Sequence, residues 1–459
     1  MVYYFKKKKK ILIANRGEIA LRAIKATRQL GFSSVSVFSK ADKNSVHVLA
    51  ADESICIGSS QPKASYLLAS ALIHIAKEKK CDAVYPGYGF LSENHDFAAQ
   101  CEQAGLIFIG PSAKIIQEMG QKDKAREIAA HYGVPIVPGS NQVFCDCDEA
   151  FKEAKSIGFP VLLKARSGGG GKGMRIVSKS SEFRSAFGQA MMEADAAFAD
   201  GYLYIEKFFS KVRHIEIQVL GDGSGEAVAF DERDCSIQRR HQKLIEESPS
   251  PVIDEKIRKK MKLAACNLAR GIKYGGAGTI EFIYDCSIKK FFFIEMNTRI
   301  QVEHPITEIR NNFDLVEAQF RIALNNEFPK PSDLGNPNGH AIEFRINAED
   351  PENNFFPSPG IIKEWYPPCG TGIRVDAAVY SGCEISPYYD SMIGKLIIYD
   401  KNRKKAIEKA RDALDKFLCN GVRTTISFHR KVIDHDIFLN NEIHTRWVET
   451  EFSKNNILG

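Results

Sequence analysis

The chain has 459 residues, which at roughly 150 residues per domain predicts about three domains. Its 44% hydrophobic and 26% charged residues are typical of a globular protein and not of a disordered chain. The net charge is +6, of which five charges belong to the single run Lys6–Lys10, so the rest of the chain has no basic surplus with which to bind nucleic acid. No apolar run approaches the ~20 residues of a membrane span.

The chain begins with this lysine run and a short apolar segment. Ile11–Ala14 is too short for the apolar region of a signal peptide, and Asn15 and Arg16 interrupt it. We interpret the lysines as a solvated tail before the first strand, with attachment to nucleic acid or an anionic surface as the alternative. The eleven cysteines lack the spacing of a disulfide framework or a zinc site, which favours free thiols in a reducing compartment, the cytoplasm of a bacterial-type cell.

Strands and helices alternate through the first quarter of the chain. The pattern predicts strands at 10–14, 34–38, 83–85 and 107–109 and helices at 18–30, 63–79 and 92–104. Short connections between alternating elements are typical of a parallel, doubly wound, Rossmann-like sheet. The first strand–helix turn, Asn15–Glu18, lacks the glycine fingerprint of a dinucleotide site, so nucleotide binding there does not follow from the fold.

Beyond Pro138 the pattern changes to an α+β arrangement with antiparallel hairpins. We expect strands at 161–165, 202–208, 214–220, 227–230, 279–284 and 291–296, and helices at 148–157, 182–194, 254–271 and 311–325. Prolines and glycines at 329–339 indicate a linker. The remainder is predicted to hold short strands at 341–346, 361–365 and 395–398 and one amphipathic helix at 403–418.

Four consecutive glycines, Gly168–Gly171, follow the strand that ends near Lys164. A glycine run adds no side chain to a core and costs backbone entropy, so it is favoured where backbone amides approach an anion such as a phosphate. Lys172 precedes a glycine rather than a serine or threonine, so this is not a Walker loop. The alternative is a surface turn.

Two glutamates stand on apolar, aromatic-rich segments that a short loop joins. In an antiparallel hairpin, Glu281 and Glu295 can lie opposite each other on one face, where they repel unless a cation lies between them. With the amide oxygen of Asn297 they form a ligand set suited to Mg²⁺ or Mn²⁺. The alternative is that both side chains face solvent.

The next segment alternates Arg299, Gln301 and Glu303. An extended conformation places all three side chains on the metal's side. An arginine fork suits a small anion such as bicarbonate, and a nearby carboxylate can be its general base. A solvated strand face with an incidental ion pair is the alternative.

The segment Glu232–Lys243 is too polar for an ordinary core strand, which favours ligand contact. RNA binding through Arg239 and Arg240 is disfavoured because no aromatic residues interleave with them. Lys122 and His214 are weaker candidates by themselves.

Together these segments resemble the ATP-grasp superfamily and, more narrowly, the biotin carboxylase family, which supplies a subunit of bacterial and plastid acetyl-CoA carboxylase. The matching stretches follow the family's order over nearly the whole chain. They are Ile13–Ala20, Pro86–Asn94, Gly168–Met174, Glu232–Lys243, Phe293–Thr307, Arg345–Asp350 and Tyr389–Lys395.

The resemblance implies a multidomain α/β and α+β fold. An N-terminal Rossmann-like domain with a parallel sheet is expected at 1–119. A central ATP-grasp domain is expected at 120–330, with a mobile lid at about 136–209, and a C-terminal β-rich domain at 331–459.

The resemblance also implies residue roles. It places the metal at Glu281, Glu295 and Asn297, and ATP at Lys122, Lys164, Gly170, Gly171, Glu206, Lys207, Phe208, Phe209, His214, Gln238, His241, Glu281 and Glu295. It places bicarbonate at Lys243, Arg299, Gln301 and Val302, makes Glu303 the base, and points Arg345 at biotin. The implied catalytic residues are Arg299, Glu303, Lys243 and Arg345.

The implied reaction is the carboxylation of biotin by ATP and bicarbonate with Mg²⁺ or Mn²⁺. Biotin is expected on a carrier protein supplied in trans, because no Ala-Met-Lys-Met-like site follows Lys395. With carboxyltransferase subunits, this is the first half-reaction of acetyl-CoA carboxylase, which feeds malonyl-CoA and fatty acid synthesis. The alternatives are a subunit of another acyl-CoA carboxylase, another ATP-grasp ligase or an inactive regulatory subunit. Lys25, Gln29 and Thr371 differ from the family's dimer contact, which leaves a homodimer open.

Overall fold

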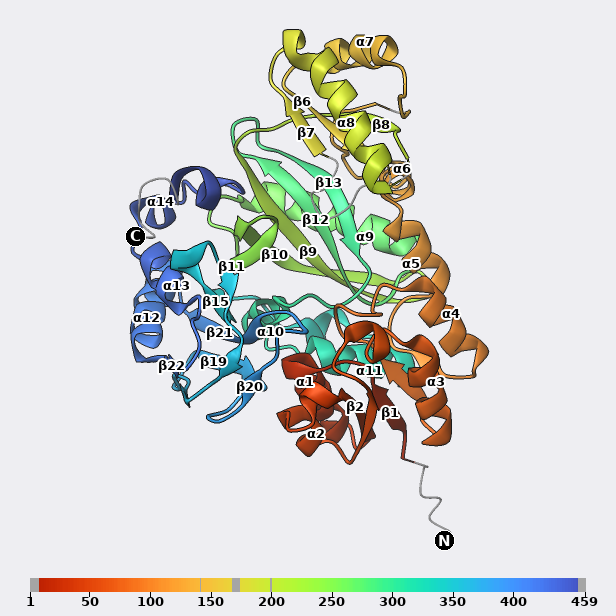
Figure 1. The fold of residues 1–459 in the computed structure, drawn as a ribbon, viewed down its shortest axis with the longest axis vertical. Helices are drawn as coiled ribbons and strands as arrows, with labels where there is room; N and C mark the ends of the chain where they lie inside the picture. The colour runs from red at the N-terminus through yellow and green to blue at the C-terminus, as the bar shows by residue number, and fades with distance from the viewer. Residues whose placement is uncertain (1–7, 141, 167–173, 199, 453–459) are drawn as a thin grey trace.

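The computed structural model describes residues 8–140, 142–166, 174–198 and 200–452. Figure 1 shows a large central sheet with the N-terminal region below it, a small α/β unit above it and the C-terminal region at its side. The predicted fold class, a mixed α/β chain with an N-terminal parallel sheet and a β-rich C-terminal region, is confirmed.

The N-terminal region is a five-stranded parallel sheet in the order β3-β2-β1-β4-β5. Both faces of its first strand are buried: Ile11 and Ile13 join one apolar core with α1 and with α11 (Leu315–Asn325), and Leu12 joins another with α3 and α4. This explains the uninterrupted apolar strand sequence. The bounds are β1 Lys10–Ile13, α1 Gly17–Gln29, β2 Ser33–Ser39, α2 Val46–Ala50, β3 Glu53–Gly58, α3 Ala69–Glu78, β4 Ala83–Tyr85, α4 His95–Gln103 and β5 Ile107–Phe108.

The prediction for this region was wrong in two places. The helix predicted at 63–79 begins only at Ala69, because the backbone leaves the helical region at Ser65 (φ −151°, ψ −101°). The strand β3 was not predicted. Lys10, the last residue of the lysine run, begins the first strand as predicted, and its backbone amide donates to Asp82 at 2.8 Å and its ammonium to Glu53 at 2.7 Å.

A small antiparallel sheet, in the order β7-β6-β8, forms the unit at the top of Figure 1. Two helices pack on it and share an apolar core of their own with the sheet. The bounds are α7 Cys147–Ile157, β6 Val161–Ala165, β7 Met174–Val177, α8 Phe183–Phe198 and β8 Leu203–Lys207.

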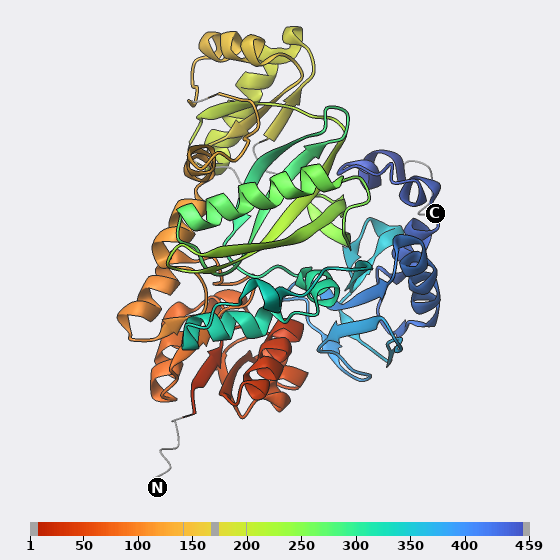
Figure 2. The same cartoon turned by 180° about the vertical axis from the view of Figure 1, so that it is seen from behind.

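An eight-stranded antiparallel sheet in the order β13-β12-β9-β10-β11-β14-β21-β19 joins the central and C-terminal regions. Figure 2 shows α9 lying across its back. The bounds are α5 Ala113–Gly120, α6 Lys122–His131, β9 Val212–Asp222, β10 Ala227–Arg239, β11 Gln242–Ser248, α9 Glu255–Gly271, β12 Gly275–Asp285, β13 Lys290–Asn297, β14 His340–Asn347, β19 Ile373–Ala377 and β21 Met392–Asp400.

The expected strand at 227–230 is much longer, and the polar segment that follows it is a buried hairpin. β10 continues to Arg239, turns at Arg240 and His241 (φ +48° and +64°) and returns as β11. Polar density therefore did not exclude a core strand here, because the buried charges meet partners on packed strands and helices: Arg233 pairs with Glu216 on β9, and Glu232 pairs with Arg258 on α9. Arg239 extends over the ring of Phe355, 4.6 Å from its centre, and thereby joins the hairpin to the C-terminal region.

The remaining elements complete the C-terminal core. The helix expected at 311–325 begins only at Leu315, because Asn311 is the last residue of the preceding helix, which ends where Asn312 adopts a left-handed conformation (φ +47°). The strand expected at 361–365 is likewise two short strands. The bounds are α10 His304–Asn311, α11 Leu315–Asn325, β15 Glu349–Asp350, β16 Phe356–Pro357, β17 Gly360–Ile361, β18 Glu364–Tyr366, β20 Glu384–Ile385, α12 Arg403–Lys416, β22 Leu418–Asn420, α13 Ile426–Ile433 and α14 Asp436–Leu439.

Candidate active site

A row of charged side chains crosses the large sheet. Glu295 on β13 lies opposite Glu281 on β12, Glu281 lies opposite Glu216 on β9, and Glu216 lies opposite Arg233 on β10. The first of these pairs is the predicted one, and its register is confirmed. Because side chains of directly paired residues share a sheet face, the antiparallel pairing gathers these charges in one place.

A cleft of about 870 Å³ lies over this row and receives side chains from all three regions. Its lining includes Tyr88 from the N-terminal region and Tyr389 from the C-terminal region. Most of the predicted site residues line it as well: Lys122, Lys164, His214, Gln238, His241, Lys243, Glu281, Glu295, Asn297, Arg299, Gln301, Val302 and Arg345.

Other predicted nucleotide contacts lie elsewhere. Glu206 accepts ion pairs from Lys164 and from Arg126, the latter at 3.2 Å, and Lys207 donates to the backbone oxygens of Gly158 and Phe159. None of Glu206, Lys207, Phe208 and Phe209 is among the described residues that line the cleft. Gly170 and Gly171 lie outside the described residues.

Lys243 stands at the centre of the charge network. Its ammonium donates to the carboxylates of Glu216 at 2.5 Å, Glu281 at 2.8 Å and Glu303 at 2.7 Å. Burial works against a charged lysine, but the three carboxylates raise the pKa of Lys243 well above its usual value. The three acidic groups can therefore be ionised together.

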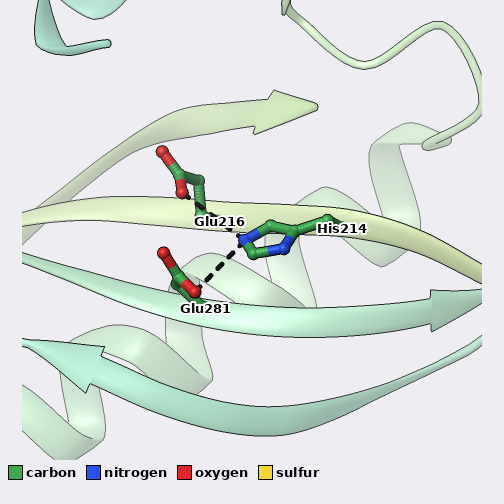
Figure 3. Close-up of side chains that lie close together, drawn as sticks. All are labelled: His214, Glu216 and Glu281. Atoms are coloured by element: carbon green, nitrogen blue, oxygen red, sulfur yellow. Dashed lines mark ion pairs between the residues drawn. The ribbon is translucent and has the colours of Figure 1, made fainter. Parts of the chain in front are cut away.

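His214 points between two of these carboxylates, as Figure 3 shows. Its Nε2 lies 3.3 Å from Glu281 and 3.7 Å from Glu216. Although burial opposes protonation, the charge of Glu281 raises the pKa of His214 to about 9. The ring is therefore a cation at neutral pH and can face an anionic ligand in the cleft.

The pair Glu281 and Glu295 fits a divalent cation. Burial and the negative charge of Glu281 raise the pKa of Glu295, which is the repulsion that a cation between the two would relieve. Asn297 donates from its amide nitrogen to Glu281 at 2.9 Å, and its amide oxygen accepts from Arg299 at 3.1 Å. In this orientation Asn297 links the carboxylate pair to the arginine.

The segment from Arg299 to Glu303 is not the extended strand that alternation predicted. The chain bends at Thr298 and Arg299 and turns at Val302 and Glu303, where α10 begins. Gln301 still reaches Glu281, to which its amide donates at 3.1 Å. Arg299 donates to Gln301 at 2.9 Å and to Glu93 at 2.8 Å, a partner from the N-terminal region.

Glu303 is fully buried and held by two cations. Lys243 donates to one of its oxygens, and Arg345 donates to the other at 3.0 Å. Burial and the charge of Glu216 oppose ionisation, but Lys243, Arg345 and Arg233 lower the pKa of Glu303. These three cations therefore hold the buried carboxyl group of Glu303 in its ionised form.

Sequence reasoning missed several residues of this network. Glu216 and Arg233 are fully buried, and Arg233 donates to Glu216 at 2.5 Å. Glu216 shares strand parity with His214, so alternation along the predicted strand at 214–220 could have found it. Alternation could not have found Arg233, because no strand was predicted for the segment that contains it.

Comparisons with known proteins agree with this geometry. Family models for the biotin carboxylase N-terminal domain, the carbamoyl-phosphate synthase L chain ATP-binding domain and the biotin carboxylase C-terminal domain match residues 7–116, 121–330 and 343–450. Biotin carboxylase 1 of Bacillus subtilis is 50% identical over 96% of this chain and 98% of its own length. A pyruvate carboxylase subunit of Methanothermobacter thermautotrophicus is 46% identical over 96% of this chain and 89% of its own length.

A solved biotin carboxylase structure is also similar to this chain along nearly its whole length. The biotin carboxylase domain dimer of Hydrogenobacter thermophilus 2-oxoglutarate carboxylase, in complex with MgADP, ADP and bicarbonate, superposes with a TM-score of 0.91 at 43% identity and covers 98% of each chain. Within the described ranges, no helix has the length and apolar character needed to cross a membrane.

Proposed function

Because this chain belongs to the biotin carboxylase family of ATP-grasp ligases, we propose that it carboxylates the biotin of a carrier protein as the first half-reaction of acetyl-CoA carboxylase. ATP, bicarbonate and biotin would give carboxybiotin, ADP and phosphate. The product would feed malonyl-CoA and fatty acid synthesis through carboxyltransferase subunits. The observation that carries the proposal is the buried Glu303 between Lys243 and Arg345, beside a pair of opposed carboxylates.

Acidic side chains would bind the metal ion, and mainly basic side chains would bind the nucleotide. Glu281 and Glu295 would hold Mg²⁺ or Mn²⁺, which supplies charge neutralisation for the phosphates. Lys122, Lys164 and His214, with Gln238 and His241, would hold the nucleotide, together with Gly170 and Gly171 from the glycine loop. The segment 206–209 would contact the nucleotide from the edge of the cleft, where Glu206 pairs with the lining residue Lys164.

Bicarbonate would lie between Arg299, Gln301 and the backbone of Val302, with Lys243 beside it. Glu303 would accept its proton, because the surrounding cations keep that carboxylate ionised at neutral pH. The deprotonated anion would attack the terminal phosphoryl group, and the carboxyphosphate formed would release CO₂ and phosphate. The phosphate would take the N1′ proton of biotin while Arg345 stabilises the developing oxyanion.

The acceptor to which the carboxyl group passes depends on the carboxyltransferase partner. The similarity to Bacillus subtilis biotin carboxylase 1 favours acetyl-CoA carboxylase. The similarity to a pyruvate carboxylase subunit supports a second candidate, the equivalent subunit of a carboxylase with another acceptor. The solved dimer supports a homodimer, and the free thiols of all eleven cysteines support a cytoplasmic location.

ADP release tests the reaction. The purified chain should release ADP in the presence of bicarbonate, and free biotin or a biotinylated carrier should accelerate that release. Acceleration by ammonia or a purine precursor instead of biotin would favour another ATP-grasp ligase. Reconstitution with carrier and carboxyltransferase should then yield malonyl-CoA from acetyl-CoA, whereas carboxylation of pyruvate alone would favour the second candidate.

A further inference from the structure

Two glutamates beside the candidate active site have no assigned role. Glu246 on β11 lies directly opposite Glu343 on β14, and both side chains are fully buried. Like charges at directly opposed positions of a sheet repel, and burial removes the water that would screen them. The pair therefore needs either two cations or a proton.

Among the residues that the structure describes, a cation pairs with only one of the two carboxyl groups. Glu246 accepts a hydrogen bond from Nε of Arg345 at 2.6 Å. Neither oxygen of Glu343 has a hydrogen-bond partner among the described residues. The nearby cation Lys395 donates instead to the backbone oxygen of Val302 at 2.8 Å and pairs with Glu18 at 3.1 Å.

The surroundings of the two groups indicate where the proton resides. Burial and the charge of Glu246 raise the pKa of Glu343 well above its usual value, although Lys395 opposes this. Burial and Glu303 raise the pKa of Glu246 as well, but Arg345 limits that shift, so the value is about 7. The pair thus keeps its proton on Glu343, and Glu246 is the group that ionises near neutral pH.

Arg345 is shared between Glu246 and the candidate base. Its Nε binds Glu246, and a terminal nitrogen binds Glu303 at 3.0 Å. A guanidinium held at two points has a fixed plane, and its remaining N–H groups can face the cleft that it lines. If Glu246 were neutral, Glu303 would be the stronger of its two partners.

We propose that Glu246, as a carboxylate, is a positioning residue that orients Arg345 toward biotin, and that Glu343 opposite it stays protonated. The proposal rests on the proposed biotin carboxylase reaction, in which Arg345 faces the biotin oxygen. Glu246 acts through Arg345 and touches no substrate. By binding Nε, Glu246 holds Arg345 at a second point besides the bond of Arg345 to Glu303.

The titration of Glu246 is set by charges from each element packed against it. Arg345 approaches from β14 beside the neutral Glu343, Glu303 from the turn before α10, and Lys243 from the same strand as Glu246. The folded-state pKa is raised, so the working carboxylate is present above about pH 7 and is lost as the pH falls through that value.

Matched amide substitutions test the assignment. Biotin-dependent ADP release should fall roughly tenfold or more at pH 8 in Glu246→Gln, because the amide oxygen can still accept from Arg345 but lacks the charge that strengthens this hydrogen bond. Glu343→Gln should keep most of the wild-type rate, because an amide replaces a group that is already neutral. ATP affinity, measured by nucleotide titration, should stay within about threefold of wild type in both.

The pH profile separates positioning from a merely structural role. The ratio of the wild-type rate to the Glu246→Gln rate should approach one in acid and grow as the pH rises through about 7. A ratio that does not change with pH would overturn the proposal. A fall of more than about tenfold in the ADP release rate of Glu343→Gln would also overturn it, and this second test holds even if Glu246→Gln does not fold. A wild-type protein that shows no biotin-dependent turnover would instead refute the proposed function itself.

Discussion

Lys243 and Glu303 are joined by a hydrogen bond of 2.7 Å although they lie 60 positions apart in the chain. This bond keeps a fully buried carboxylate ionised, which is the state that a general base requires.

Replacing Glu303 by glutamine should lower kcat for biotin carboxylation by roughly 100-fold or more, the usual scale for losing a general base. The amide keeps the size of the side chain and can still accept from Lys243. Steady-state kinetics with varied bicarbonate checks this, and nucleotide affinity should be nearly unchanged. The exposed Glu352→Gln serves as a control with wild-type kinetics. A higher bicarbonate KM at unchanged kcat would assign Glu303 to positioning and not to proton transfer.

Glu281→Gln and Glu295→Gln should each raise the Mg²⁺ concentration needed for half-maximal ATPase activity. The two carboxylates lie opposite each other, so one cation would use both, and the double variant should lose less than the sum of the two single losses in free energy. Titration of Mg²⁺ at fixed ATP measures this. Full activity of either variant at limiting Mg²⁺ would contradict the assignment of the metal ligands.

Lys395→Met should destabilise the protein strongly. Lys395 is fully buried, and its removal leaves Glu18 without its ion pair and Val302 without a donor. Breaking a buried pair in this way costs about 3–5 kcal/mol in the free energy of unfolding. Urea denaturation measures the loss, with the exposed Lys405→Met as the control that should behave like wild type. Equal stability of the two variants would show that the buried contacts of Lys395 do not support the fold.

The stabilising effect of Glu247 should depend on pH. Although burial opposes its ionisation, Arg403 and His340 lower the pKa of Glu247 to about 2, below its ordinary value of 4.5. A lowered folded-state pKa gives stability that is present above about pH 4.5 and is lost as the pH falls toward 2.

Glu247→Gln should therefore lower the free energy of unfolding by about 3 kcal/mol at pH 7. The difference from wild type should shrink steadily below about pH 4.5. Urea denaturation of both proteins across this range measures it. A difference that is independent of pH would mean that packing, and not charge, is what Glu247 contributes.

Residue pattern along the chain predicted much of the local architecture and the opposed pair Glu281 and Glu295. Alternation of apolar residues predicted the strands of the N-terminal sheet, with the exception of β3. It also predicted the register that sets Glu281 against Glu295. These features could be predicted because period and loop length fix which side chains share a face, with no need to know what lies beyond the hairpin.

Tertiary structure alone decided how the buried charges are paired. Glu232–Lys243 was judged too polar for a core strand, yet Arg233 and Lys243 lie in strands because their partners come from β9, β12 and the turn before α10. Arg345 and Glu246 likewise lie 99 positions apart. A buried charge is stable only beside its counter-charge, and when that partner is remote in sequence, local periodicity carries no information about it.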